Sequence, residues 1–324
     1  MLTGLTDSIR PMRARVGIYV LAGAALGLAL LLAAFRVGER AGALSGWQAL
    51  VLGLVQGLTE LLPISSSGHL ILVPWAADWR YLETHSEFNK TFDVGLHLGT
   101  LVAVVAYFRA DLARLVAAWF RSVRARAARD ADERVAWLVV IATIPAVLVG
   151  ALGEGFIEEH LGDPWQIALT LAFFAGVLWL ADRTEQRREI SSLSYRDGLT
   201  IGLAQVLSLM PGVSRSGITI SAGRFLALDR ESAARFSFLL LVPVTLGAVL
   251  WKGLTDVVLA DLPPGSGGPF VVGMLAAAAS GFVAIDLLLG YVRRHDYTPF
   301  VIYRLILALI ILLLIASGAR DATF

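Results

Sequence analysis

Two short stretches of the chain carry side chains suited to phosphate chemistry. The first, LTELLPISSSGH at 58–69, offers the carboxylate of Glu60, the hydroxyl of Ser66 and the imidazole of His69. The second, MPGVSRSGITIS, lies further along the chain and offers the guanidinium of Arg215. A guanidinium binds phosphate oxygens, a serine can attack phosphorus, and a carboxylate or an imidazole can move the proton. Glu60 also suits a divalent cation that bridges to phosphate oxygens.

The rest of the chain is typical of membrane-embedded sequence. Of its 324 residues, 57% are hydrophobic and 16% are charged, and the mean hydropathy is +0.72. A soluble domain has about 45–50% apolar and about 25% charged residues. The apolar runs approach the roughly 20 residues that cross a bilayer, which predicts an all-α, polytopic membrane protein. The net charge of +1 gives no general attraction to nucleic acid, and the absence of cysteine excludes disulfide and thiol chemistry.

The charge of the connecting segments predicts how the chain crosses the membrane. Segment 109–134 carries seven arginines, whereas 154–164 carries none and has four acidic residues. Arginine-rich segments stay in the cytoplasm, so the N-terminus and 109–134 are expected inside and 154–164 outside. The arginines would also contact anionic membrane lipids. The seven predicted transmembrane helices are 16–35 and about 92–108, 135–153, 165–181, 236–252, 269–290 and 299–317.

Two further apolar stretches, 47–75 and 198–228, are each interrupted in the middle. Pro63 in the first stretch, and Pro211 with Gly212 in the second, predict that each stretch breaks into two short helices. The alternation of charge is preserved only if each stretch is a re-entrant helix pair instead of a full crossing. Such backbone is tolerated at membrane depth where protein buries it or water reaches it.

The two interrupted stretches resemble each other. With an offset of 149 residues, eight of nineteen aligned positions are identical, including Gly53 with Gly202 and Ser65 with Ser214. The charge alternation brings one copy in from the outside and the other from the inside. The chain is therefore predicted to be an inverted-topology repeat whose broken helices meet near the middle of the membrane.

If the two copies face each other, their polar side chains converge on one pocket. Serines at the start of the second helix of each pair are good N-caps, and the backbone N–H groups beside them favour an anion. Asp93 and His97, one helical turn apart on the next span, are weaker candidates for a supporting role. The expected substrate-binding residues are Gln56, Ser65, Ser67, Ser214, Ser216 and Thr219.

The motifs QGLTELLPISSSGH and PGVSRSGITIS resemble the signatures of the undecaprenyl-diphosphate phosphatase family, of the bacitracin-resistance type. The resemblance implies removal of the terminal phosphate of undecaprenyl diphosphate, which recycles the carrier lipid for peptidoglycan synthesis and confers bacitracin resistance. It divides the chain into an additional N-terminal transmembrane helix (1–45), a phosphatase-like membrane domain (46–317, with repeat 1 at about 46–153 and repeat 2 at about 197–290) and a C-terminal tail (318–324).

The resemblance also implies roles for single residues. Glu60, Ser66, His69 and Arg215 are the expected catalytic residues. Gln56 takes the first position of the acidic motif, which leaves Glu60 as the carboxylate for the expected cofactor, Mg²⁺ or Ca²⁺. Attack by Ser66, with His69 or Glu60 handling the proton, is the preferred mechanism. Direct attack by His69 or by water remains open.

The resemblance also predicts the cellular location of the protein. A polyprenyl diphosphate keeps its tail in lipid, so the expected location is the bacterial inner membrane, with the active site open to the periplasm. The chain is also expected to be capable of forming a homodimer. The alternative class is a secondary transporter or lipid flippase, because inverted repeats with broken helices are common in transporters.

Overall fold

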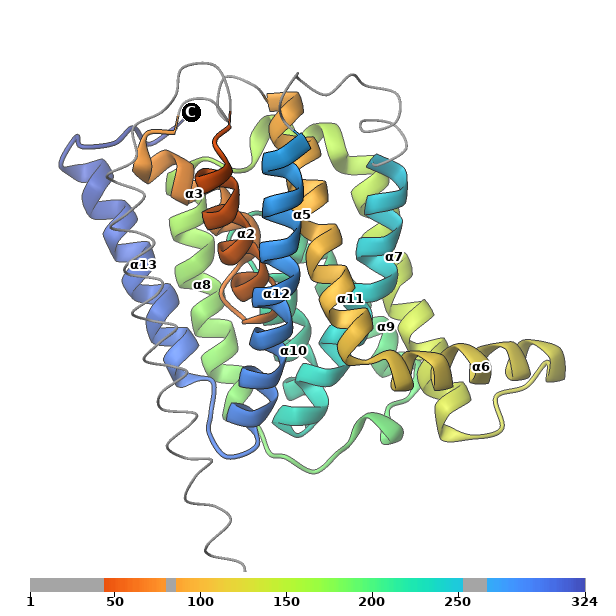
Figure 1. Cartoon of the computed structure of the whole chain (residues 1–324). Coiled ribbons are helices and arrows are strands. Elements are labelled where there is room, and N and C mark those ends of the chain that lie inside the picture. The colour runs from red at the N-terminus through yellow and green to blue at the C-terminus, as the bar shows by residue number, and fades with distance from the viewer. Residues whose placement is uncertain (1–43, 80–85, 253–266, 324) are drawn as a thin grey trace, which may run out of the picture. The chain divides into compact units, whose positions relative to one another are not determined.

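The structure, a computed structural model, describes residues 44–79, 86–252 and 267–323. Apart from one isolated β-bridge, the regular structure in these residues is helical, as predicted (Figure 1). The predicted first span, 16–35, lies outside them. The helices are α2 (Gly46–Leu61), α3 (Ser66–Ala77), α5 (Ser86–Tyr107), α6 (Arg109–Ala125), α7 (Ala131–His160), α8 (Pro164–Asp182), α9 (Tyr195–Val206), α10 (Arg215–Phe225), α11 (Arg230–Lys252), α12 (Gly267–Val292) and α13 (Thr298–Ala316), with 3₁₀ turns η1 (Ile190–Ser192) and η2 (Leu207–Leu209).

Five helices are long and apolar enough to cross a membrane, which makes the chain a multi-pass membrane protein. They match the last five predicted spans. The predicted span 92–108 falls in α5, a helix whose first half is polar and which is not one of the five. The five segments are Ala131–Gly153, Pro164–Asp182, Arg230–Leu250, Gly267–Val292 and Thr298–Ala316.

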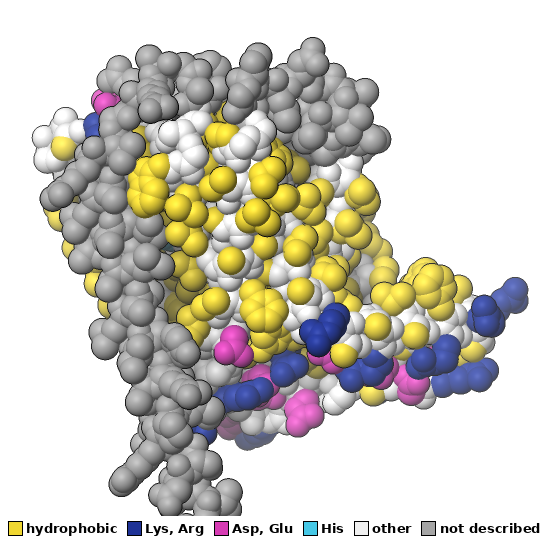
Figure 2. All heavy atoms as spheres, viewed as in Figure 1, with side chains coloured by type: hydrophobic (Ala, Val, Ile, Leu, Met, Phe, Trp, Pro, Cys, Tyr) yellow, Lys and Arg dark blue, Asp and Glu magenta, His cyan; other side chains and the backbone are white. Residues whose placement is uncertain are grey.

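The outer faces of these helices carry large apolar side chains. Leu152 on α7 is 89% exposed, Phe173 on α8 is 67% exposed and Leu275 on α12 is 60% exposed. Figure 2 shows hydrophobic side chains over the visible face of the bundle and charged ones gathered at its lower end. So much exposed apolar surface would be a liability in water, and it fits contact with lipid.

Close helix pairs form where glycine removes the side chain. α2 packs along α12, and α9 packs along α7. A Cβ atom at Gly53 would lie 2.2 Å from the carbonyl oxygen of Gly273, and one at Gly202 would lie 2.6 Å from that of Ala142. Small residues allow such approach between membrane helices. The two glycines are separated by the same 149 residues that relate the two interrupted stretches.

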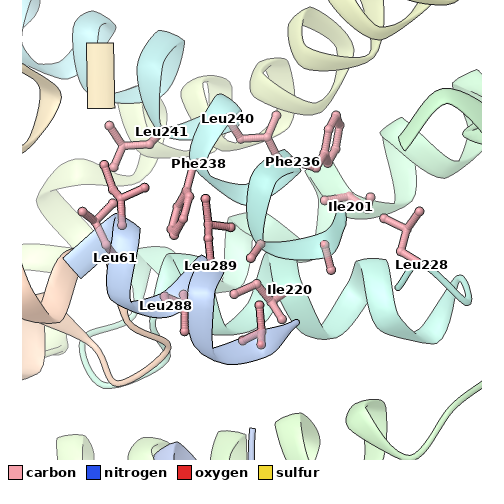
Figure 3. Close-up of a cluster of buried hydrophobic side chains, with 14 of the residues drawn as sticks. Leu61, Ile201, Ile220, Leu228, Phe236, Phe238, Leu240, Leu241, Leu288 and Leu289 are labelled. Atoms are coloured by element: carbon pink, nitrogen blue, oxygen red, sulfur yellow. The ribbon is translucent and has the colours of Figure 1, made fainter. Parts of the chain in front are cut away.

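A cluster of buried apolar side chains joins α2, α9, α10, α11 and α12 (Figure 3). Lipid tails are as apolar as leucine, so in a membrane this cluster stabilises the fold mainly through close packing. Its members include Leu61, Ile201, Ile220, Leu228, Phe236, Phe238, Leu240, Leu241, Leu288 and Leu289.

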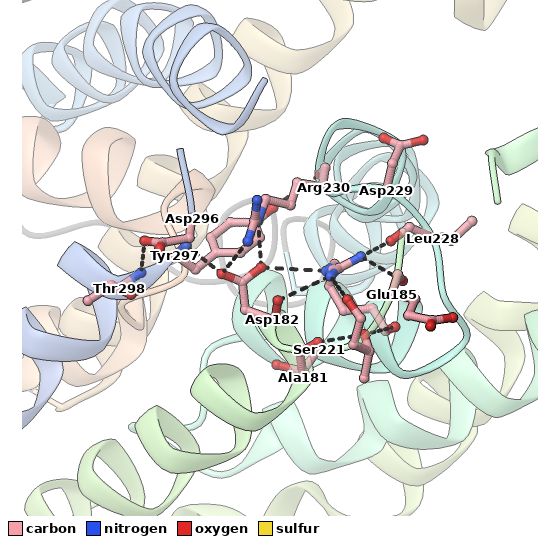
Figure 4. A network of polar contacts seen from close by, with 12 residues as sticks. Ala181, Asp182, Glu185, Ser221, Leu228, Asp229, Arg230, Asp296, Tyr297 and Thr298 are labelled. Atoms are coloured by element: carbon pink, nitrogen blue, oxygen red, sulfur yellow. Dashed lines mark hydrogen bonds and ion pairs between the residues drawn. The ribbon is translucent and has the colours of Figure 1, made fainter. Parts of the chain in front are cut away.

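A buried carboxylate ties four helix ends together at the end of the bundle where α8 finishes (Figure 4). Asp182 accepts hydrogen bonds from Nε of Arg230 at 2.7 Å and from the backbone N–H of Tyr297 at 2.8 Å. The guanidinium of Arg224 lies 3.5 Å from the same carboxylate. Asp182 therefore links the end of α8 with the end of α10, the start of α11 and the start of α13.

Candidate functional site

The turn between α2 and α3 presents the first group of polar residues. Pro63 has no N–H to continue α2, which ends two residues earlier. Ser65 then adopts a φ of 77°, an uncommon value for a residue with a side chain, and its Oγ accepts a hydrogen bond from the N–H of Gly68 at 3.3 Å. Ser66 is the first residue of α3 and its hydroxyl turns back toward α2.

The turn between η2 and α10 repeats this geometry. Ser214 has a φ of 75°, and its Oγ accepts a hydrogen bond from the N–H of Gly217 at 3.0 Å. Gly212, two residues earlier, has a φ of 92°, which favours glycine. Arg215 starts α10, as Ser66 starts α3. The matching local sequences thus fold into matching turns.

The two turns are in direct contact. The N–H of Gly212 donates to Oγ of Ser65 at 3.1 Å, and Oγ of Ser216 donates to the carbonyl oxygen of Leu62 at 2.9 Å. Each turn therefore provides a hydrogen-bond partner for a backbone group of the other, which a buried turn requires. The polar tips that the sequence predicts to converge lie together.

Glu60 occupies the centre of the site. Its Oε1 accepts a hydrogen bond from Nη2 of Arg215 at 3.0 Å, and its Oε2 accepts the hydroxyl of Ser66. Nε2 of Gln56 lies 3.3 Å from Oε2, and Nε2 of His97 lies 3.7 Å from it. The carboxylate and guanidinium side chains are only 6% and 11% exposed, so their charges interact with little screening by water. Ser66 and Arg215 thus touch the same carboxylate, one from each turn.

A cavity of about 410 Å³ opens beside these residues. Its lining is mostly polar and includes four apolar side chains, which come from α5 and α11. Such a cavity has room for a phosphate group with an apolar chain attached. Its polar lining is Glu60, Ser66, Ser67, Lys90, Asp93, His97, Ser208, Ser214, Arg215 and Thr245, and its apolar lining is Val94, Val244, Ala248 and Val249.

The two histidines near the site are placed differently. His69 is not a lining residue of this cavity: Nδ1 lies 2.6 Å from the carbonyl oxygen of Ser65, and Nε2 lies 2.6 Å from the hydroxyl of Tyr303 on α13. His97 does line the cavity. Its Nδ1 lies 2.7 Å from the carbonyl oxygen of Asp93, which makes Nδ1 the donor, and its Nε2 faces Glu60.

The predicted substrate-binding residues divide into two groups. Ser67 and Ser214 line the cavity. Ser65 and Ser216 connect the two turns, and Gln56 donates toward Glu60 from a fully buried position. Thr219, the sixth, is also buried and donates to the hydroxyl of Ser237 at 2.7 Å.

Arg304 is a residue that the sequence reasoning missed. It lies in the middle of α13, its side chain is fully buried, and its guanidinium donates to backbone carbonyl groups around both turns. The available signal was a charged residue inside the apolar run 298–316, because ionisable residues within membrane helices mark functional positions.

The donor set around the site fits a divalent cation only in part. Among the described residues, no group of three or more His, Cys, Asp and Glu side chains is arranged to hold a metal ion. Glu60 and Asp93 are the two carboxylate residues that line the cavity, and both oxygens of Glu60 already accept hydrogen bonds. A Mg²⁺ or Ca²⁺ ion here would take most of its ligands from water and from a substrate's phosphate oxygens, which is usual for Mg²⁺.

These features define a class: a helical, multi-pass membrane protein with a serine, a carboxylate and an arginine around one cavity. The family model for bacitracin resistance protein BacA matches residues 49–310. The chain is 46% identical over 283 residues to an undecaprenyl-diphosphatase of Thermomicrobium roseum, covering 85% of this chain and 99% of the relative. It is 46% identical over 266 residues to an undecaprenyl-diphosphatase of Moorella thermoacetica, covering 82% and 95%. The chain belongs to the BacA family.

Proposed function

We propose that this protein hydrolyses undecaprenyl diphosphate to undecaprenyl phosphate and inorganic phosphate. The observation that carries the proposal is the carboxylate of Glu60, which accepts hydrogen bonds from both Ser66 and Arg215 beside one cavity. That arrangement suits phosphoryl transfer, and it occurs in a chain related over most of its length to proteins named undecaprenyl-diphosphatase. The product is the carrier lipid for peptidoglycan synthesis, so its recycling would confer resistance to bacitracin.

In the proposed mechanism, Ser66 is the nucleophile. Its Oγ attacks the terminal phosphorus while its proton passes to Glu60, and Arg215 binds the oxygens of the phosphoryl group in transfer. The bond from that phosphorus to the bridging oxygen breaks, and undecaprenyl phosphate leaves. Water then attacks the phosphoserine and releases phosphate. His97, with Nε2 toward the carboxylate, is suited to take up or return the proton.

His69 is less suited to direct attack. Both of its ring nitrogens have partners, the carbonyl oxygen of Ser65 and the hydroxyl of Tyr303. Its proposed part is to hold the start of α3 against α13. Trapping the phosphorylated residue after a single turnover and locating it by mass spectrometry separates the three mechanisms: phosphate on Ser66 supports this one, phosphate on His69 refutes it, and no phosphoenzyme favours water.

The divalent cation is also a proposal. Glu60 is the residue that would hold Mg²⁺ or Ca²⁺, together with phosphate oxygens and water. When bound, the ion would offset the negative charge of the diphosphate. The steps assigned to Ser66, Glu60 and Arg215 do not pass through it.

We further propose that the two broken helix pairs are re-entrant and form an inverted repeat. α2 packs on α12 and α9 packs on α7, so each first half-helix packs on a full helix of the other repeat. Such an exchange is expected for two repeats related by a pseudo-two-fold axis, and the alternation of charge supports an inverted relation. The arginine-rich segment 109–134 supports a cytoplasmic position for α6, which leaves the first pair to open toward the periplasm. With the predicted spans 16–35 and 92–108, the count would be seven.

Membrane lipids are the proposed partners of α6, which projects sideways from the bundle (Figure 1). Val116, Phe120 and Val123 are 54%, 60% and 44% exposed on one of its faces. Arg114 and Arg121 are more than half exposed on another face. An amphipathic basic helix of this kind lies in the headgroup layer of a membrane that contains anionic lipid. A homodimer remains a prediction.

The alternative function is a secondary transporter or flippase, and the exchange of helices between repeats is an observation that favours it. One experiment separates this alternative from hydrolysis. Purified protein is supplied with a short-chain prenyl diphosphate, and phosphate release is measured beside lipid flux in proteoliposomes. The phosphatase proposal expects release that is lost in Ser66→Ala and Arg215→Ala. Flux that survives Arg215→Ala, with no phosphate released by the wild type, would favour the transporter.

A further inference from the structure

Arg304 makes four hydrogen bonds, all to backbone carbonyl oxygens. Nη1 donates to Pro63 at 3.3 Å, and Nη2 donates to Gly212 at 3.0 Å and Val213 at 3.1 Å. Nε donates to Leu171 on α8 at 3.2 Å. Three of the four acceptors therefore belong to the two turns that carry Ser66 and Arg215.

The positions of these acceptors are related by the repeat. Pro63 and Gly212 differ by the same 149 residues that align Ser65 with Ser214. One nitrogen of the guanidinium binds the first turn, and the other nitrogen binds the equivalent carbonyl of the second. A planar fork with two separate donor ends suits this task, and a lysine, with one nitrogen, does not.

The guanidinium of Arg304 is buried, so it would be energetically unfavourable without hydrogen-bond partners. Arg304 is 0% exposed, and none of the described carboxylates forms an ion pair with it. A buried cation in a membrane helix is unfavourable unless other groups satisfy it, and here carbonyl dipoles do so. The guanidinium also lies against the first turn of α10, since a Cβ at Gly217 would approach Nη1 to 3.0 Å.

We propose that Arg304 is a positioning residue, which fixes the distance between the two turns so that Ser66 and Arg215 address the same phosphoryl group. The inference rests on the proposed phosphatase function. Arg304 does not line the cavity, so it acts through the turns. A displacement of about 1 Å in reacting groups costs about 10²-fold in rate.

The test compares Arg304→Lys and Arg304→Met with Arg224→Lys in purified protein. Arg224 is a matched control, because it is also 0% exposed and also donates to backbone carbonyls, but its partners lie in the Asp182 network and not in either turn. We expect kcat for a short-chain prenyl diphosphate to fall about 10²-fold in the Arg304 variants. KM should stay within about threefold, since the cavity lining is intact. Arg224→Lys should lower Tm and leave kcat within about twofold.

A second readout does not depend on activity. Amide hydrogen exchange is followed in peptides that cover 60–70 and 210–218, where the N–H groups of Gly68, Gly212 and Gly217 are hydrogen-bonded within or between the turns. Exchange should accelerate in both peptides in the Arg304 variants and in neither peptide in Arg224→Lys. This holds even if the wild type releases no phosphate, in which case the proposed function fails and the positioning role stands.

Three results would overturn the inference. The first is an Arg304 variant with wild-type kcat and unchanged exchange in the turns. The second is an Arg224 variant that loses kcat to the same extent. The third is failure of both Arg304 variants to yield folded protein, which would make Arg304 a support of the whole fold instead of the two turns.

Discussion

The hydrogen bond from Ser66 to Glu60 predicts that these two residues act as one unit in catalysis. Ser66→Ala removes the proposed nucleophile, and Glu60→Gln removes the proposed acceptor of its proton, so either change should disable the same step. Gln at position 60 removes the negative charge but keeps an oxygen that can accept the hydrogen bond from Arg215, whose guanidinium lies 3.0 Å from the carboxylate. The double variant should be no slower than the slower single variant.

The magnitude follows from the role of each group. Loss of a general base costs about 10²–10⁴-fold in rate, which is about 3–5 kcal/mol at about 1.36 kcal/mol for each tenfold change. Two independent residues would together lose about 10⁴–10⁸-fold. Residues that act as one unit lose only about 10²–10⁴-fold together, so the expected coupling energy is about 3–5 kcal/mol.

The assay is the initial rate of phosphate release from a short-chain prenyl diphosphate by purified wild-type, single-variant and double-variant protein. The control pair is Ser66→Ala with Asp182→Asn. Asp182 does not line the cavity, so any loss of rate that Asp182→Asn causes should multiply with the loss caused by Ser66→Ala. Losses that multiply in the Ser66 and Glu60 double variant would refute the reasoning, since they would mean that the serine is activated by another group.

Three further outcomes are expected. His97→Asn should lower kcat about tenfold or more, because His97 lines the cavity. His69→Asn should change kcat less than about threefold and lower Tm, because His69 bonds Ser65 and Tyr303. The reverse ranking of the two variants in the phosphate assay would contradict the proposed roles. Asp182→Asn should cost about 3 kcal/mol of unfolding free energy in denaturant titration, since it weakens a buried ion pair, and an unchanged midpoint would refute this. EDTA should lower the rate of phosphate release and added Mg²⁺ or Ca²⁺ should restore it; a rate indifferent to both would remove the cation from the proposal.

Much of the helical frame could be predicted from local sequence. The apolar runs predicted the ends of the five spans to within six residues, and Pro63 and Gly212 marked the two breaks, because proline and glycine act on the backbone directly. The offset of 149 residues paired the two turns before any contact between them was known. The spans and the breaks depend on residues that are neighbours in the chain, and the offset compares two such local patterns.

Side-chain direction could not be predicted in the same way. Spacing allowed Ser66 and His69 to share one face of α3, but the hydroxyl of Tyr303, 234 residues further on, holds the imidazole elsewhere. His97 approaches Glu60 because α5 passes close to α2. Helical periodicity describes a face, and only the packing of other helices decides what that face meets.

The repeat separates the residues that build the frame from those that perform chemistry, and this division can be tested. Ser65 and Ser214 are identical and hold matching turns, whereas Ser66 stands opposite Arg215 in the alignment and the two differ in function. Loss of an N-cap hydroxyl costs about 1–2 kcal/mol. Ser65→Ala and Ser214→Ala should therefore both lower the unfolding free energy, and Ser65→Ala should cost about 1 kcal/mol more because it also leaves the N–H of Gly212 without an acceptor.

Ser66 should differ from Ser65 and Ser214 in its effect on catalysis. Ser66→Ala should abolish the phosphoenzyme while leaving stability nearly unchanged, because Ser66 makes no bond between the turns. If Ser65→Ala destabilised the protein by several kcal/mol and Ser214→Ala did not, the two turns would contribute very differently to the free energy of unfolding. The repeat would then describe the path of the backbone without describing how the site is held together.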